Sequence, residues 1–347
     1  MAEVNIFLLV ISSIGLDLLI GDPLFLVHPV QVMGFFISKS SKYCVCLFNK
    51  KEDLLKWSGL FIAFITILIS FSAGKLLEIF FLKSNNNILW GLAILFGLSS
   101  CLATKSLISR VREISYLINN LINKKFIDEN SLKKIVSKVQ KIVSRDVTSS
   151  SLEDLLRSTV ESLTENSVDG IFGPLFWIFI GTFSIHYSIY LPGPLSLGFT
   201  YKAISTLDSM IGYKYDFYKK LGFFSAKIED FATYIPARLV VYSLPFVKKR
   251  TKKYYDLIQT VFEEGHRYES PNAGISEGIF AHVANVQLGG TNIYPNGVVN
   301  KPILNSQGEK CTFDSVEIIK NLIFRLLLLW IFLFTVIFLL INLQQTT

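Results

Sequence analysis

The sequence predicts an all-α, polytopic integral membrane protein: a helical bundle of about four to six membrane segments with a large cytoplasmic face. Three observations lead to this class. The chain of 347 residues is 51% hydrophobic and only 18% charged, whereas a soluble domain usually carries about 25% charged residues. Its mean hydropathy is +0.45. The apolar residues gather in separate long runs, which is the pattern that membrane helices produce.

The apolar runs mark the expected membrane spans. They cover approximately residues 5–21, 57–82, 88–108, 171–199 and 322–342. Pro192-Gly193-Pro194 breaks the fourth run, which therefore either crosses the membrane or re-enters as a hairpin. Irregular backbone is tolerated in a membrane only where protein or a cavity buries it. With no internal repeat, a single membrane-embedded domain over residues 1–347 is the simplest organisation.

The charges set the expected orientation. The net charge is +7, and the basic residues lie in loops and polar segments between the apolar runs, at about 22–56, 109–170 and 200–320. The positive-inside rule places such segments on the cytoplasmic side. We therefore expect a multi-pass protein of the inner (cytoplasmic) membrane. No dense Lys/Arg tract is interleaved with stacking aromatics, so no nucleic-acid partner is expected.

An acidic helix precedes the fourth apolar run. Ser150-Ser-Leu-Glu153 is a capping-box pattern that predicts a helix over about 151–168. Glu161, Glu165 and Asp169 recur at every fourth position, opposite a leucine-rich arc. One interpretation is an amphipathic helix that shows its charges to water. The other is a metal site, because like charges four apart repel and a carboxylate near the membrane is costly, and Mg²⁺ would relieve both.

Other polar residues beside the apolar runs suit the same chemistry. Asn166 lies at the edge of the leucine-rich arc and should be packed and hydrogen-bonded. Lys202 and Asp208 follow the Pro-Gly-Pro break and suit a phosphate and a metal or amine, although each alone is more typical of a snorkelling interfacial residue. Arg238, shortly after Asp230, can bind phosphate or carboxylate through two parallel hydrogen bonds.

The first apolar run carries an acid of its own. Asp17 lies within it, and a carboxylate in a span costs roughly 3 kcal/mol on insertion scales. A partner or a function is therefore expected for Asp17, with Asp22 and His28 close behind it in the sequence.

Two loops rich in turn-forming residues complete the set. Asn272 lies in Ser270-Pro-Asn-Ala-Gly274, and Gly289-Gly290 could present backbone amides to an anion. Walker A, GxGxxG, HExxH and nucleophile-elbow motifs do not occur in the sequence. Together these residues indicate an acid-rich, phosphate-capable site at the cytoplasmic interface.

Six sequence blocks carry a family resemblance. LDLLIGDPLFLVHPVQVMG, VESLTENSVDGIFGPLFW, YKAISTLDSMIGY, the Pro-Ala-Arg of YIPARL, SPNAG and LGGTNIY occur in this order between residues 16 and 294. In these blocks the chain resembles the CbiB/CobD family, the adenosylcobinamide-phosphate synthases of cobalamin biosynthesis. The resemblance implies a membrane ligase that joins a propionate of adenosylcobyric acid to (R)-1-amino-2-propanol or its O-phosphate. It also implies ATP as the driving nucleotide.

The residues and the resemblance together lead to an assignment of roles. We expect Asp208, Glu165 and Lys202 to act in catalysis, and Glu161, Glu165 and Asp169 to hold Mg²⁺. The residues expected to bind substrate or phosphate are Asp17, Asp22, His28, Asn166, Arg238, Asp230, Asn272, Gly289 and Gly290. ATP and Mg²⁺ are the expected cosubstrate and metal, without a tightly bound prosthetic group. The expected partners are the lipid bilayer, the corrinoid, aminopropanol or its phosphate, and other cobalamin-assembly enzymes or a second copy of the chain.

The chain departs from the family pattern in three places. Ser225-Ala-Lys-Ile-Glu-Asp230 stands where the family usually has Ser-Ala-Arg-x-Asp-Asp, Thr233 replaces an expected Asn, and residues 275–282 diverge. A related membrane family, the AmpE-like proteins, shares the fold and is linked to signalling. A non-catalytic membrane sensor or a transporter subunit is therefore the rival interpretation.

Overall fold

Helices dominate the fold. The computed structural model describes residues 2–21, 28–48, 51–84, 87–123, 129–212, 218–248, 253–294 and 297–346. In these ranges most residues are helical, and the β-structure consists of one two-stranded sheet and isolated bridges. The predicted all-α membrane class is confirmed, although the sequence did not lead us to expect the strands.

The chain divides into two compact units. One comprises residues 1–105, 169–234 and 334–347, and the other comprises residues 106–168 and 235–333. The prediction of one domain over the whole chain stays a prediction.

Membrane helices account for much of the chain. Among the described residues, four helical stretches are long and apolar enough to span a membrane: Glu52–Lys83, Ile88–Ile122, Leu152–Tyr187 and Phe313–Gln344. The predicted spans at 57–82, 88–108 and 322–342 lie inside three of them. The predicted span at 5–21 corresponds to a shorter apolar helix, Val4–Leu19. Consequently the chain is a multi-pass membrane protein.

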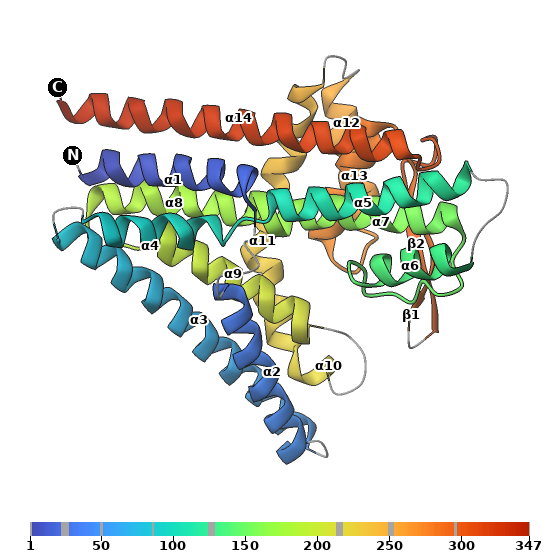
Figure 1. The fold of residues 1–347 in the computed structure, drawn as a ribbon, viewed down its shortest axis with the longest axis horizontal. Helices are drawn as coiled ribbons and strands as arrows, with labels where there is room; N and C mark the ends of the chain where they lie inside the picture. The colour runs from blue at the N-terminus through green and yellow to red at the C-terminus, as the bar shows by residue number, and fades with distance from the viewer. Residues whose placement is uncertain are drawn as a thin grey trace. The chain divides into compact units, whose positions relative to one another are not determined.

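The first unit is built from packed helices. It contains α1 (Ala2–Leu19), α2 (Pro29–Phe48), α3 (Glu52–Lys83), α4 (Ile88–Ser99), α8 (Gly173–Tyr187), α9 (Pro194–Ile211) and α10 (Tyr218–Leu221). Helix α3 packs against α2, α4, α9 and α10, and α1 lies beside α4 and α8 (Figure 1). A π-helix, Val168–Phe172, leads directly into α8.

Helix α2 corrects the expectation of a loop after residue 22. Ile37 of α2 is fully buried and belongs to one apolar cluster with Leu55 and Ile62 of α3 and Leu207 of α9. Apolar burial against neighbouring helices therefore holds residues 29–48 helical despite their lysines.

Two charged residues of α3 hold the break in the fourth apolar run. Helix α8 ends at Tyr187, and α9 begins at Pro194. The fully buried carboxylate of Glu78 accepts hydrogen bonds from the backbone N–H groups of Leu195 (2.7 Å) and Ser196 (3.0 Å). It thus takes two of the unpaired amides at the start of α9.

The approach of α3 to α9 is close. Lys75, one turn before Glu78, donates to the carbonyl of Ile189 at 2.7 Å, inside the break. A Cβ at Gly74 would lie 2.7 Å from the Cα of Ser196. Only glycine therefore fits at position 74 of α3, and the broken segment is fixed to this helix by side-chain hydrogen bonds.

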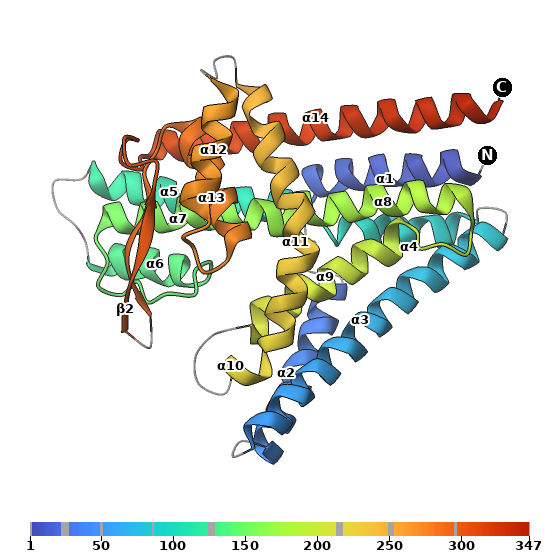
Figure 2. The same cartoon turned by 180° about the vertical axis from the view of Figure 1, so that it is seen from behind.

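The second unit combines helices with the sheet (Figure 2). It contains most of α5 (Thr104–Ile122), α6 (Glu129–Gln140), α7 (Leu152–Ser167), the end of α11 (Phe223–Ser243), the 3₁₀-helix Leu244–Val247, α12 (Tyr254–Gly265), α13 (Pro271–Ala284), β1 (Leu288–Tyr294), β2 (Gly297–Leu304) and most of α14 (Phe313–Thr346). Helix α13 packs against α12, α7 and both strands, and α7 also contacts β1.

The acidic helix forms where the sequence predicts it, with a different cap. Helix α7 covers Leu152–Ser167, but its N-cap is Ser151 rather than Ser150. The Ser151 hydroxyl accepts from the backbone N–H of Asp154 (3.1 Å) and donates to the Asp154 carboxylate (2.7 Å). Asp154 therefore performs the capping that the sequence pattern assigned to Glu153.

The role of Glu78 generates a stability prediction. Glu78→Ala leaves two backbone amides and the Ser196 hydroxyl without their buried acceptor, so we expect a loss of about 2–3 kcal/mol in unfolding free energy. Thermal unfolding of the detergent-solubilised protein measures this loss. Glu52→Ala, at the start of the same helix with an exposed Lys220 partner, serves as the control and should leave the melting temperature unchanged. Equal melting of the two variants would contradict the role of Glu78.

Candidate functional site

Glu161 is the centre of a buried ion-pair network in the second unit. Its side chain is 2% exposed. One carboxylate oxygen accepts from the Arg157 guanidinium (2.9 Å) and from the backbone N–H of Gly289 (2.8 Å). The other accepts from the Arg145 guanidinium. A buried carboxylate is costly unless it is paired and hydrogen-bonded, and Glu161 meets both conditions.

Strand β1 completes the network. The side-chain carbonyl of Asn292 accepts from Arg145 and, at 3.4 Å, from Arg157. Arg157 also donates to the backbone carbonyls of Gly289 and Thr291. The network thus joins helix α7, the segment that precedes it and the start of the hairpin.

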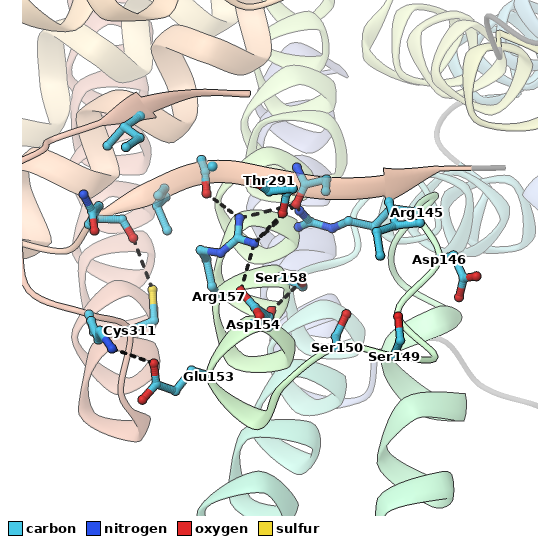
Figure 3. Close-up of a pocket in the computed structure, with 18 residues that line it drawn as sticks. Arg145, Asp146, Ser149, Ser150, Glu153, Asp154, Arg157, Ser158, Thr291 and Cys311 are labelled. Atoms are coloured by element: carbon cyan, nitrogen blue, oxygen red, sulfur yellow. Dashed lines mark hydrogen bonds and ion pairs between the residues drawn. The ribbon is translucent and has the colours of Figure 1, made fainter. Parts of the chain in front are cut away.

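A pocket of about 440 Å³ opens beside this network. Figure 3 shows Arg145 and Arg157 pointing toward one another below the strand, with Asp154 next to Arg157. Acidic, basic and hydroxyl side chains alternate around the pocket, and its lining residues include Arg145, Asp146, Ser149, Ser150, Glu153, Asp154, Arg157, Gly289, Gly290, Asn292, Lys310 and Cys311. Burial, with a smaller contribution from Glu161, raises the pKa of Cys311 to about 12. Its thiol is therefore protonated at neutral pH and is a poor nucleophile.

A second polar group lies behind β1. Glu277 of α13 is fully buried, and Lys301 of β2 places its ammonium nitrogen 3.6 Å from a Glu277 oxygen. The same nitrogen lies 5.1 Å from the centre of the Tyr268 ring. Burial raises the pKa of Glu277 to about 8, while Lys301 opposes this shift and Glu161 and Glu165 add to it. The acids of α7 and α13 therefore form one electrostatic neighbourhood.

Backbone conformation and close packing explain why glycines occupy positions 289 and 290. Gly289 and Gly290 have φ values of +87° and +92°, at an irregularity in the strand pairing. A Cβ at Gly289 would lie 2.1 Å from the backbone oxygen of Pro302 and 3.1 Å from the Tyr268 hydroxyl. Only glycine fits there, and it lets the backbone N–H reach Glu161.

Several predicted site residues meet in this unit. Glu165 is half-buried one turn after Glu161. The Asn166 amide donates to the carbonyl (2.8 Å) and hydroxyl (3.0 Å) of Ser162, as the packed position predicted. Arg238 donates to the buried side chain of Asn272 at 2.8 Å. The blocks VESLTEN, SPNAG and LGGTNIY, distant in sequence, thus contribute to a single unit.

The other predicted residues belong to the first unit. Buried Asp17 accepts from the backbone N–H of Thr104 at 3.0 Å, which caps the start of α5. His28 accepts from the backbone of Val30 (3.3 Å), and Asp230 pairs with Lys227 at 3.7 Å.

Lys202, Asp208 and Asp169 also belong to the first unit. Lys202 and Asp208 are half-buried on α9, and Asp169 lies in the π-helix. Asp22 lies outside the described residues. How these residues combine with those of the second unit stays a prediction.

The placement of Glu161 corrects the expectation of an exposed acidic stripe. The helical pattern put it opposite the apolar arc, but β1 and Arg145 cover that side of α7 and bring guanidinium groups to it. Across the described ranges, no group of three or more His, Cys, Asp or Glu side chains is arranged to hold a metal ion. The metal roles of Glu161, Glu165 and Asp169 stay predictions.

The structure adds residues that sequence reasoning missed. Arg145, Tyr268, Glu277, Asn292 and Lys301 were not selected as candidates. Glu277 could have been selected from the sequence, because it is the single acid in the apolar helix Pro271–Ala284. The same criterion selected Asp17. Arg145 and Lys301 gave no such signal, since their partners lie on other elements.

The fold and the buried network define a multi-pass membrane protein with an internal acid–arginine centre beside a pocket. A family model described as "CobD/Cbib protein" matches residues 10–323. The chain therefore belongs to the CobD/Cbib family and has a role in cobalamin biosynthesis. No solved structure matches it.

Curated relatives agree with this membership, and each is named "Cobalamin biosynthesis protein CobD". The Synechocystis protein is 33% identical over 307 residues, which cover 88% of this chain and 84% of the relative. The Streptococcus sanguinis protein is 30% identical over 345 residues, 98% of each chain. The Clostridium tetani protein is 31% identical over 302 residues, 86% of this chain and 87% of the relative.

The network generates a second stability prediction. Glu161→Ala leaves Arg145 and Arg157 buried without their shared carboxylate, so we expect a loss of about 3–5 kcal/mol in unfolding free energy. Thermal unfolding in detergent, with and without Mg²⁺, measures the loss and shows whether the metal affects it. Glu153→Ala, on the same helix and paired only with the exposed Lys310, is the matched control. An unchanged melting temperature for Glu161→Ala would refute the role of the network.

Proposed function

We propose that this protein joins a propionate side chain of adenosylcobyric acid to (R)-1-amino-2-propanol or its O-phosphate, with ATP as cosubstrate. The product is adenosylcobinamide or its phosphate. The family membership across residues 10–323 carries the proposal. The buried polar centre of the second unit supports it, because three of the blocks that resemble the family contribute residues there.

The proposed amide-forming reaction requires specific chemical groups. A carboxylate becomes reactive toward an amine when ATP converts it to an acyl phosphate with release of ADP. The amine nitrogen then attacks the carbonyl carbon, the C–N bond forms, the C–O bond to phosphate breaks, and phosphate leaves while the nitrogen loses its extra protons. Such a reaction needs cations on phosphate oxygens and an acceptor for the protons.

The residues of the chain supply these groups. In the proposal, Lys202 and Arg238 bind phosphate oxygens, and Asp208 and Glu165 hold or accept protons from the amine. The nucleotide would arrive as its magnesium complex, which requires few protein carboxylates because Mg²⁺ keeps phosphate and water ligands. Arg145 and Arg157 are fixed by Glu161 at the pocket wall, and this preorganisation suits a polar substrate.

The membrane setting is part of the proposal. The basic segments between the apolar runs favour an active site on the cytoplasmic side of the cell membrane. In that position the site would receive the corrinoid and ATP from the cytoplasm. Contact with other cobalamin-assembly enzymes, or with a second copy of the chain, belongs to the same proposal.

A ligation assay tests the function and two of its residues. Membranes containing the wild-type protein should convert adenosylcobyric acid only when ATP and an amine are both present. Glu165→Gln and Asp208→Asn should each lower the rate by at least about 100-fold, the scale of lost acid–base assistance. Glu129→Gln, an exposed acid of α6 outside the pocket, is the control for expression and folding and should keep the wild-type rate. Wild-type rates in both variants would refute the roles of Glu165 and Asp208. If the wild-type protein does not convert adenosylcobyric acid, the proposed function is wrong.

A further inference from the structure

Glu277 and Tyr268 are buried polar residues that lack internal hydrogen-bond partners. Glu277 is fully buried, and Tyr268 is 7% exposed. Among the described residues, neither the two carboxylate oxygens of Glu277 nor the Tyr268 hydroxyl find a hydrogen-bond partner. Buried polar groups in native proteins are almost always hydrogen-bonded, and exceptions call for an explanation such as a ligand.

Lys301 balances the charge of Glu277 without binding it. Its nitrogen lies 3.6 Å from the nearer Glu277 oxygen, which exceeds hydrogen-bond length. In its ionised form, which predominates above about pH 8, the side chain has a compensating positive charge while both oxygens keep their capacity to accept hydrogen bonds. A ligand that fits this site carries a group with several N–H donors and is not an anion.

The surroundings of the pair agree with such a ligand. Glu161 and Glu165 of α7 add negative potential at Glu277 and at Tyr268, while Arg145 and Lys301 supply the positive charges of the neighbourhood. The Lys301 ammonium beside the carboxylate disfavours a metal ion or a second ammonium, so the amine fits there as its neutral base.

Tyr268 lies next to the pocket lining. Gly289 lines the pocket, and a Cβ at this position would come within 3.1 Å of the Tyr268 hydroxyl. Gly290 also lines the pocket, and no neighbouring atom would lie within 4 Å of a Cβ added at this position. The Tyr268 hydroxyl therefore lies beside a glycine that lines the pocket.

We infer that Glu277 and Tyr268 receive the amine substrate: the carboxylate of Glu277 accepts the N–H groups of a primary amine, and the hydroxyl of Tyr268 donates to the oxygen substituent on the neighbouring carbon. This inference rests on the proposed function, since it locates the amine of that same reaction.

Tyr268→Phe is the decisive variant. The hydroxyl has no hydrogen bond among the described residues, so its removal breaks no contact there and should leave the melting temperature unchanged. Glu277→Gln keeps the shape of the side chain and removes its charge. Titration calorimetry of the purified full-length protein measures binding of 1-amino-2-propanol and of its O-phosphate. We expect each variant to raise the Kd for both amines at least about tenfold.

Matched controls lie on the neighbouring helix α12. Tyr254→Phe removes a hydroxyl that bonds to a backbone carbonyl outside the cluster, and Glu263→Gln changes an acid of the same helix that is also outside it. Both should bind the amines like the wild type. Amine Kd values for Tyr268→Phe within twofold of the wild type would overturn the inference, whatever the folding of Glu277→Gln.

Activity separates this inference from the function on which it rests. If the wild type ligates and Tyr268→Phe keeps its KM for the amine, the inference fails and the proposed function stands. If the wild type binds the amine through Glu277 and Tyr268 but forms no amide, the proposed function fails and the binding site stands. A raised KM for the amine with an unchanged KM for ATP supports both.

Discussion

The buried carboxylate of Glu161 is the constraint on which the second unit depends. It accepts hydrogen bonds from two guanidinium groups and a backbone amide, which come from α7 itself, the preceding segment and β1. Each of these groups is costly to bury alone, and the network satisfies them together. Gly289 must be glycine because this arrangement brings β1 close to Pro302 and Tyr268. Two arginines and a backbone amide at the pocket wall are thus positioned by this one acid.

The family relation gives this constraint its functional meaning. The ligation that we propose requires charged substrates to be held while water is kept from a reactive acyl group, and a fixed set of buried charges would serve that purpose without reorganisation. Arg145 and Arg157 cannot swing freely, because Glu161 and Asn292 hold them. The polar centre is therefore a rigid frame beside the pocket.

Sequence reasoning succeeded where the signal was local. Apolar runs of membrane length, the helix at 151–168 and the packed position of Asn166 each follow from residues close together in the chain. It failed where partners are distant: β1 covers the face of Glu161 that the helical pattern assigned to water, and Arg145 approaches from outside the helix. The hairpin was missed because Gly289-Gly290 interrupts the alternation typical of strands. Glu78 resembles Asp17 as an acid within an apolar run, so one criterion should have selected both.

The cap that Glu78 provides has a consequence for biogenesis. Helix α3 carries Lys75 and Glu78 within an apolar stretch, yet the amides that Glu78 binds follow it by 117 residues or more. During synthesis α3 must enter the membrane before α9 exists, with only the 3.8 Å pair between these two side chains to offset their charges. The charged groups of α3 therefore lack their full set of partners until α9 has been synthesised. The amides of α9 then complete the stabilisation of α3 in the membrane.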